Sequence, residues 1–466
     1  MENAINHTSS DDIVTSDRKK ARKAVIAAYQ GTFIDLADQY VPVIALASAM
    51  VYFQSPAITG PAATLIYFSM FAATMLGRPL GSLIFGPLSD RLGRRRVSLI
   101  SVAGFSTITL IISLLPGYES IGFWAPTALI VLRFITGIFI GGEYSAALPL
   151  AYEYTEKRRR GFLGGILQGA NAVSYAFISI IVLVVLAFAP DGSLESPYVQ
   201  WGWRIPFVFV AFMGFAYFLY RLKELPESEL WRGSARPKTP VRTVLSSAGF
   251  WQVFVLMTGL FLCSNSISST VPGFLTSQFH NSGQVATWTV LITQFFLMGA
   301  YLIAGAIGQK YGRRKTLIGY GIFHATISAC VWWAFVTAGK GNLQLVLAVL
   351  AQILVAASFA VVNPYVNERF STSVRSTGFG LGWSMGVIIP AFFAFYMNWL
   401  SNFMPYTATP AVLLAIGGIL VAVGAFVGPE TNDIDIAVAR DAEVATTTTE
   451  KFAPDNIRLS PQRGDA

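Results

Sequence analysis

Asp35, Asp38 and Arg133 stand inside long apolar segments, where a charged side chain is costly to bury. Asp35 and Asp38 are three residues apart, so on a helix they share one face. Two buried carboxylates on one face could bind and release a proton near neutral pH. Ionisable residues at membrane depth usually mark a proton or substrate pathway. We favour Asp38 as the proton site, because it lies deeper if the helix begins near Val25. The alternative places both acids at a hydrated helix end, where they cap the helix or pair with a cation.

Two arginines share these apolar segments. Arg133 begins a run that reaches Glu143, slightly under three helical turns further on. Its guanidinium stays charged, so it must face a cavity, an acid such as Asp35 or Asp38, or an anionic substrate. Glu143 could be a partner in helix packing. Arg78 could clamp a substrate carboxylate or extend its charge towards the lipid surface.

Isolated polar or amphipathic residues in the apolar runs nominate a substrate cavity. Each of them could equally form a hydrogen bond between helices. They are Gln168, Asn171, Asn265, Gln294, Asn363 and Trp383.

The composition indicates what holds these residues. Of 466 residues, 54% are hydrophobic and 12% are charged, whereas soluble chains carry about a quarter charged residues. A helix crosses a bilayer with about 20 apolar residues. These values indicate a membrane protein and exclude a cytosolic enzyme, a nucleic-acid binder and a disulfide scaffold. His7, His280 and His324 lie far apart, so we expect no catalytic constellation, no metal site and no cofactor.

Twelve apolar runs of helix length predict an all-α membrane protein of two six-helix halves. The runs are 25–50, 61–85, 97–116, 124–150, 162–189 and 204–222, then 250–275, 285–307, 317–338, 343–365, 377–400 and 409–428. The predicted organisation is a tail at 1–24, a first half at 25–222, a linker at 223–249, a second half at 250–428 and a disordered tail at 429–466.

The basic residues predict the orientation, because cytoplasmic loops retain Lys and Arg. With both termini in the cytoplasm, 29 of the 33 basic residues fall in cytoplasmic segments, and Lys340 alone falls in an outer loop. We therefore expect a multi-pass protein of the cell membrane with both termini cytoplasmic.

An 11-residue loop motif is repeated in the two halves. Gly86-Pro-Leu-Ser-Asp90-Arg-Leu-Gly93-Arg-Arg-Arg96 recurs 219 residues later as Gly305-Ala-Ile-Gly-Gln309-Lys-Tyr-Gly312-Arg-Arg-Lys315. Glu153 and Arg160 likewise match Glu368 and Arg375. Matching halves are what a duplicated transporter predicts. Positive anchoring alone would explain the arginines but not the glycines, the acids or the spacing.

The Gly-x-x-x-Asp-Arg-x-Gly-Arg-Arg motif resembles the signature loop of the major facilitator superfamily. Three further stretches, Gly77-Arg78-Pro79-Leu80-Gly81, the run from Arg133 to Glu143, and Gly202-Trp-Arg-Ile-Pro-Phe207, are similar to the metabolite:proton symporter family. That family carries organic acids, shikimate-like acids or zwitterionic osmolytes. The resemblance implies a twelve-helix fold and a role in proton transfer for Arg133, with a structural ion pair as the alternative.

The resemblance also implies a cytoplasmic latch. Its expected members are Asp90, Arg91, Gly93, Arg94, Arg95, Glu153, Arg160, Gly312, Arg313, Glu368 and Arg375. We expect Asp90 to approach the N-terminus of a helix near Thr377, because the positive end of a helix dipole favours an anion. Gln309 replaces the acid in the second half, so we expect an asymmetric gate.

The predicted function is proton-coupled import of a small organic acid by alternating access. The substrate anion would meet Arg133 and Arg78, and Asp35 or Asp38 would take the proton. The partners would be a small molecule, protons and the lipid bilayer, and the chain would be a monomer that binds no nucleic acid. Alternatives are symport of a zwitterionic osmolyte or amine such as betaine or proline, and drug or metabolite export.

Overall fold

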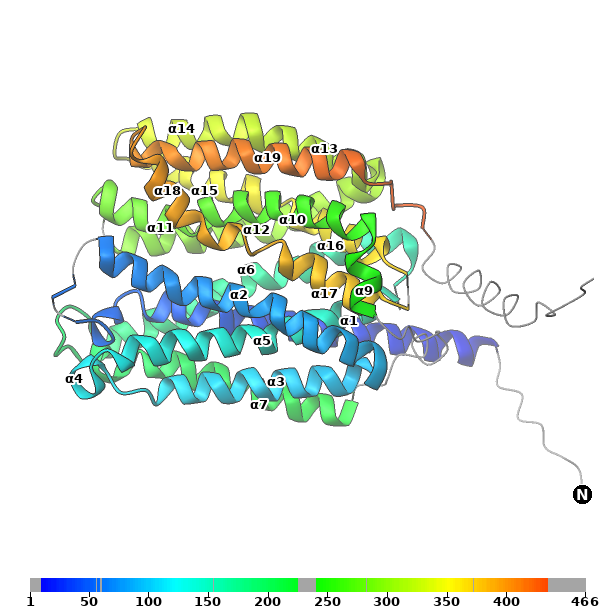
Figure 1. Cartoon of the computed structure of the whole chain (residues 1–466), viewed down its shortest axis with the longest axis horizontal. Coiled ribbons are helices and arrows are strands. Elements are labelled where there is room, and N and C mark those ends of the chain that lie inside the picture. Colours follow the sequence, from blue (N-terminus) through cyan, green and yellow to red (C-terminus); the bar gives the residue numbers. More distant parts are fainter. Residues whose placement is uncertain are drawn as a thin grey trace, which may run out of the picture.

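The protein is a bundle of long helices lying roughly side by side (Figure 1). The computed structural model describes residues 10–55, 57–58, 61–153, 155–224, 240–281, 283–371 and 373–434. Every regular element in these ranges is helical. Most of the predicted linker, 225–239, and residues 435–466 of the predicted tail lie outside the described residues.

The helices fall into two sets. The N-half contains α1 (Ser10–Ala45), α2 (Pro61–Leu92), α3 (Arg94–Ser113), α4 (Tyr118–Ile121), α5 (Trp124–Glu153), α6 (Arg160–Phe188) and α7 (Arg204–Glu224). After the short α9 (Pro240–Leu245), the C-half contains α10 (Ala248–Ser268), α11 (Thr270–Gly273), α12 (Gly283–Tyr311), α13 (Arg313–Phe323), α14 (Ala329–Thr337), α15 (Asn342–Ala356), α16 (Phe359–Arg369), α17 (Arg375–Met385), α18 (Phe393–Leu400) and α19 (Thr409–Val427).

The predicted membrane spans correspond to these helices. In the described part of the chain, eleven helical segments are long and apolar enough to cross a membrane. The twelfth span is α1, which falls outside that set because it carries Gln30, Asp35, Asp38 and Gln39. It begins at Ser10 rather than near Val25.

Several C-half spans are interrupted where the sequence predicted continuous helices. The span 342–369 consists of α15 and α16, and the span 375–400 consists of α17 and α18 with a 3₁₀ turn at Pro390–Phe392 between them. Proline lacks the N–H that continues a helical ladder, which accounts for the break at Pro390.

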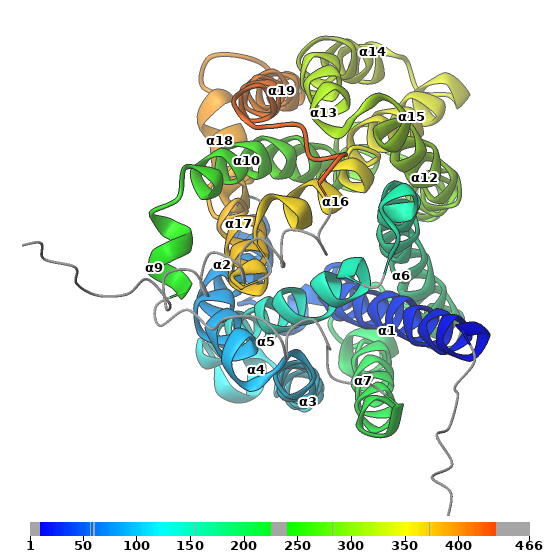
Figure 2. The same ribbon diagram turned by 90° about the vertical axis from the view of Figure 1, so that its right-hand side faces the viewer.

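The two halves lie on either side of a central region when the molecule is viewed from the end where α1 begins and α19 ends (Figure 2). They meet where α6 packs against α12 and α16, and where α2 packs against α17. We call the end that holds the α2–α3 and α12–α13 turns the basic end, because it carries Arg91, Arg95, Arg96, Arg313 and Arg314.

Helices α2 and α5 touch at backbone distance inside the N-half. A side chain at Gly81 would overlap the carbonyl of Ile138, and one at Gly141 would overlap the carbonyl of Arg78. These glycines explain the spacing of the two motifs that contain Arg78 and Arg133. Their close contact fixes both arginines relative to one another inside the bundle.

Candidate functional site

A central cavity of about 690 Å³ lies between the two halves. Its lining follows α1 from Leu36 to Val43 and continues past the end of that helix to Ser48 and Gln54. The cavity therefore runs from the middle of the bundle towards the end opposite the basic end. This volume lies in the range of typical small-molecule sites, roughly 300–1,000 Å³.

Six of the eight predicted substrate residues line this one cavity. They are Arg78, Gln168, Asn171, Asn265, Gln294 and Trp383. Arg133 and Asn363 do not line it. Asn363 is buried in α16, where its carbonyl oxygen accepts a hydrogen bond at 3.0 Å from the side chain of Asn367.

Arg78 projects from α2 into the cavity wall and is only 4% exposed. Its Nη2 donates to Oε1 of Gln39 at 2.5 Å. A lipid-facing position for Arg78, which the sequence left open, is therefore wrong. A cation at this place can meet an anionic group that enters the cavity.

The sequence reasoning missed several polar lining residues. Gln39 and Tyr40 follow Asp38 directly on α1, and the Tyr40 hydroxyl donates to Oδ1 of Asn171 at 2.7 Å. The rings of Tyr40 and Tyr175 meet edge to face with centroids 4.8 Å apart. Gln39 is a polar residue in an apolar run, so the criterion that selected Gln168 could also have found it.

The C-half contributes an aromatic wall formed by Phe261, Phe359 and Trp383. The Trp383 ring lies 5.9 Å from Phe261 and 6.0 Å from Phe359, measured between centroids. It also stacks on Phe379, with the two centroids 5.4 Å apart. The wall gives the cavity an apolar surface contributed by the C-half, whereas α1, α2 and α6 contribute polar lining residues.

Asp38 and Arg133 form an ion pair beneath the cavity. Nη2 of Arg133 lies 3.5 Å from Oδ2 of Asp38, and Nη1 donates to the backbone carbonyl of Asp38 at 3.1 Å. Thr109 donates to the other carboxylate oxygen. Of the options that the sequence left for Arg133, an acid partner is the one observed.

Asp35 lies in a different environment, although it shares the same helix face. It is 1% exposed, and neither carboxylate oxygen has a hydrogen-bond partner among the described residues. The charges that act on it are those of Arg78, Glu143 and Asp38. An ionised carboxylate in this position is costly unless a nearby cation compensates its charge.

Glu143 is paired separately. Nη1 of Arg221 donates to its Oε1 at 2.6 Å, and Ser98 donates to Oε2. Both side chains are almost fully buried. Glu143 therefore links α5 to α7 and α3, in agreement with a packing role.

At the basic end, Asp90 joins the N-half to the C-half. Its Oδ2 accepts hydrogen bonds from the backbone N–H of Thr377 at 3.1 Å and from Oγ1 of Thr377 at 2.5 Å. Thr377 lies in the first turn of α17, so the carboxylate sits at the positive end of that helix. This is the contact that the sequence predicted.

The second half repeats this contact without the charge. Oε1 of Gln309 accepts from the backbone N–H of Gly161, in the first turn of α6, at 2.9 Å. The first glycine of each motif allows the approach. A Cβ on Gly86 would lie 3.2 Å from Cα of Thr377, and one on Gly305 would lie 2.3 Å from the carbonyl oxygen of Gly161.

The second glycine of each motif turns the chain. Gly93 and Gly312 precede α3 and α13 with φ of 102° and 94° and ψ of 148° and 144°. This backbone region is essentially restricted to glycine. The structure thus assigns a geometric reason to both repeated glycines, which positive anchoring alone could not explain.

Three further ion pairs close the basic end. Nη1 of Arg375 lies 2.8 Å from Glu153, and Nη1 of Arg160 lies 3.4 Å from Glu368. Arg313 also pairs with Glu368. Since the first two pairs join opposite halves, the central cavity is sealed at this end.

The chain after α19 adds a further contact across the halves. The carboxylate of Glu430 accepts the backbone N–H groups of Arg313 and Arg314, at 2.8 and 3.1 Å. Lys157 of the N-half donates to the carbonyl of Asp433 at 2.8 Å, and Arg160 donates to that of Ile434 at 3.0 Å. Residues 429–434 are thus ordered, although the sequence placed them in a disordered tail.

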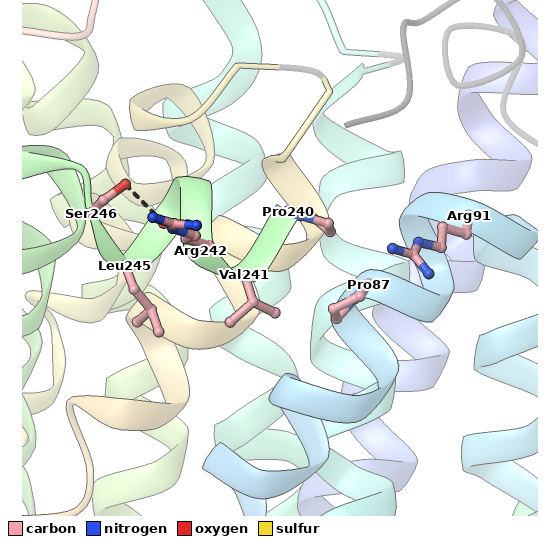
Figure 3. Close-up of a pocket in the computed structure, with 7 residues that line it drawn as sticks. All are labelled: Pro87, Arg91, Pro240, Val241, Arg242, Leu245 and Ser246. Atoms are coloured by element: carbon pink, nitrogen blue, oxygen red, sulfur yellow. Dashed lines mark hydrogen bonds between the residues drawn. The ribbon is translucent and has the colours of Figure 1, made fainter. Parts of the chain in front are cut away.

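The remaining predicted latch residues lie at the same end. Arg95 donates to the carbonyl of Leu222 at 2.5 Å, and Arg94 begins α3. Arg91 lines an open groove of about 660 Å³ between the end of α2 and α9 (Figure 3). Pro87, Val241 and Leu245 form its apolar surface, and Arg242 stands on the side opposite Arg91.

The chain forms two six-helix halves with a central cavity between them, and contacts between the halves close the cavity at the basic end. This is the architecture of a secondary transporter. The model of the Major Facilitator Superfamily matches residues 29–394. The chain belongs to the major facilitator superfamily.

Its relatives are transporters of small metabolites. It is 26% identical to the alpha-ketoglutarate permease of Escherichia coli strain K12 over 81% of this chain and 87% of that one. It is 27% identical to the shikimate transporter of the same strain, over 80% and 86%, and 25% identical to its proline/betaine transporter, over 88% and 85%. The similarity to transporters of organic acids, of shikimate and of proline or betaine is confirmed.

The fold is also found among solved structures. The proton:xylose symporter XylE bound to 6-bromo-6-deoxy-D-glucose superposes with a TM-score of 0.74, and the alignment covers 89% of this chain and 97% of that one. The two sequences are 17% identical, so this likeness shows the fold alone.

Proposed function

We propose that this chain is a proton-coupled symporter that imports a small organic acid across the cell membrane by alternating access. The observation that carries the proposal is Asp35, a buried carboxylate without a hydrogen-bond partner among the described residues. Its compensating cation, Arg78, lines the central cavity. One arginine therefore serves the proton site and the substrate site together.

This arrangement gives a physical reason for coupling. In the empty cavity the charge of Arg78 lowers the cost of ionising the buried carboxyl group of Asp35. A substrate carboxylate that binds Arg78 compensates the same charge, so Asp35 is then better neutral, with a proton bound. Substrate and proton favour each other's binding, and linkage makes this effect reciprocal.

Asp38 has the structural role in this proposal. Its ion pair with Arg133 keeps both charges satisfied in the interior, and removing either charge would leave the other buried alone. We therefore propose Asp35 as the proton site, in place of Asp38, which the sequence favoured.

The contacts at the basic end would hold the gate of the transporter. Asp90, Glu153 and Arg160 join the halves there, while the cavity extends towards the opposite end. Because basic residues gather at the cytoplasmic side of membrane proteins, we assign the basic end and both termini to the cytoplasm. The state described is then open to the outside, and the gate contacts must break for release.

Uptake into proteoliposomes tests the proposal. A panel of radiolabelled organic acids would be added with an inward proton gradient, and again after a protonophore has dissipated it. We expect accumulation above equilibrium only with the gradient, whereas exchange between internal and external substrate continues without it. Accumulation that is insensitive to the protonophore would exclude proton coupling.

A further inference from the structure

The lining of the central cavity contains few charged side chains. Of the described residues that line it, Arg78 is the one with a formally charged side chain. Arg133 is fully buried outside the lining and is engaged with Asp38. A substrate that fills this cavity therefore finds one cationic partner.

The single cationic side chain in the lining limits the negative charge that a bound substrate can carry. A single carboxylate can pair with Arg78, and this removes most of the cost of taking it from water. A second carboxylate would have to rest against amides, hydroxyls or the aromatic wall of Phe261, Phe359 and Trp383. Burying an ionised group without a counter-charge is strongly unfavourable.

The other lining residues indicate the chemistry of the uncharged part of the substrate. Apart from Arg78, the described polar groups that line the cavity are neutral, and they include Gln39, Tyr40, Gln168, Asn171, Gln294 and Gln352. Gln294 makes no hydrogen bond to the residues that the structure describes, so both its donor and acceptor sites are available. Amides can donate to and accept from hydroxyl groups, so an apolar chain beside Gln294 would leave that amide unsatisfied.

Resting on the proposed function, we infer that the substrate is a hydroxylated monocarboxylate with one net negative charge, and that the cavity discriminates against dicarboxylates. The carboxylate lies at Arg78 beside the N-half. The hydroxylated body extends towards Gln294 and Gln352 of the C-half. Cationic groups are disfavoured as well, because the described lining holds no carboxylate to receive them.

Equilibrium binding without any gradient tests this inference. Isothermal titration calorimetry would be run on the full-length protein in detergent at pH 7.5, where carboxylic acids are ionised. Gluconate and glucarate form one matched pair, since they differ by a terminal hydroxymethyl group against a second carboxylate. Monomethyl succinate and succinate form another pair. Hexanoate tests the hydroxyl groups, and glycine betaine tests a zwitterion.

We expect the monocarboxylate of each pair to bind at least about tenfold more tightly than its dicarboxylate, because the second charge is buried without a partner. Gluconate should bind more tightly than hexanoate or betaine. Equal or tighter binding of glucarate or succinate would overturn the inference. So would a preference for betaine, or no binding of any probe.

Variants extend the test to single positions. Arg78→Gln should abolish binding of gluconate, while Arg78→Lys keeps the charge and should retain weaker binding. Gln294→Arg adds a second cation and should raise the affinity for glucarate relative to gluconate, whereas the uncharged Gln294→Met should not. An unchanged ratio in well-folded Gln294→Arg would count against the inference, whatever the fate of the Arg78 variants.

This experiment is separate from the test of proton coupling. If monocarboxylates bind more tightly at equilibrium while accumulation is unchanged by the protonophore, the proposal of proton coupling fails and the inferred substrate class stands. If accumulation follows the gradient but dicarboxylates bind as tightly as monocarboxylates, the substrate class fails and coupling stands.

Discussion

Arg133 of α5 and Asp38 of α1 form an ion pair, with 3.5 Å between Nη2 and Oδ2, and neither side chain is exposed. The arginine also holds the backbone carbonyl of Asp38 at 3.1 Å. Three residues earlier on the same helix, Asp35 has no such partner among the described residues. The two acids thus differ in the one property that decides whether a carboxylate can change its charge during a transport cycle.

Asp38→Asn should destabilise the protein because it leaves the Arg133 charge buried and unpaired. The loss should be about 3–5 kcal/mol, as for other buried pairs that lose one partner. The double variant Asp38→Asn with Arg133→Gln removes both charges and should recover most of this stability. Thermal unfolding in detergent measures both. A single variant as stable as the wild type would show that the pair contributes little.

Asp35→Asn should preserve the fold and abolish coupling. The amide has nearly the same shape as the acid and breaks no hydrogen bond to a described residue. Accumulation driven by a proton gradient should disappear, while counterflow of labelled substrate should persist. Asp35→Glu keeps a titratable carboxyl group at the same position and serves as the matched acid-to-acid control.

The pH dependence of binding gives a second measurement for Asp35. In the wild type, substrate affinity should rise as the pH falls, because the protonated carboxyl and the bound anion favour each other. In Asp35→Asn this dependence should be lost. The charged groups around Asp35 are Arg78 on α2, Glu143 on α5 and Asp38 on α1. Of these, Glu143 and Asp38 have arginine partners of their own, Arg221 and Arg133. A dependence that survives in Asp35→Asn would move the proton site elsewhere.

The sequence predicted the helices and the contact between Asp90 and Thr377 better than the lining of the cavity. The loop that contains Asp90 resembles a known signature motif, and the dipole of a helix favours an anion at its N-terminus, so Asp90 could be matched to the helix near Thr377 without coordinates. The spacing of Asp35 and Asp38 fixes a shared face but not the neighbours of that face. It could not show that Arg133 pairs with Asp38 rather than with Asp35.

The cavity residues were predicted because they are polar residues in apolar runs. Polarity does not indicate whether a side chain points into the cavity or towards a neighbouring helix. Gln294 and Asn363 are both polar residues in apolar runs, yet Gln294 lines the cavity while Asn363 bonds to Asn367 within α16. The aromatic wall was missed because Phe261 and Phe359 resemble ordinary packing residues in a chain rich in phenylalanine.

Asp90→Asn should weaken the gate at the basic end. The amide can still accept a hydrogen bond from Thr377 but loses the charge at the N-terminus of α17. Such charges contribute about 0.3–1 kcal/mol, and up to ~2 kcal/mol when partly buried. Cysteines placed in the sealed region of a cysteine-free background should then react faster with a maleimide. Thr377→Val removes the Oγ1 donor and keeps the charge, so it should have a smaller effect. If labelling rates stay unchanged in both variants, Asp90 is not part of the gate.

Gly93→Ala should destabilise the protein by about 1–3 kcal/mol, because the φ of 102° is strained for any residue with a side chain. Gly312→Ala should destabilise the protein at least as much, because φ is 94° there and the added methyl group would also lie 2.5 Å from Oε2 of Glu430. Gly319→Ala is the control, because an added methyl group there meets no atom within 4 Å and α13 is helical at that position. It should be neutral or stabilising. Thermal unfolding would rank the three variants, and equal effects would contradict the backbone explanation.

The short segment from Glu430 to Ile434 has a practical consequence for handling the protein. Because Glu430 caps α13, and Asp433 and Ile434 reach Lys157 and Arg160 of the opposite half, the position of a deletion or an affinity tag decides what is studied. A chain shortened after residue 434 keeps these tethers, whereas one shortened after residue 428 loses all of them. Comparing the transport rates of these two truncated proteins would show whether residues 429–434, which follow the last membrane helix, control the rate of the transport cycle.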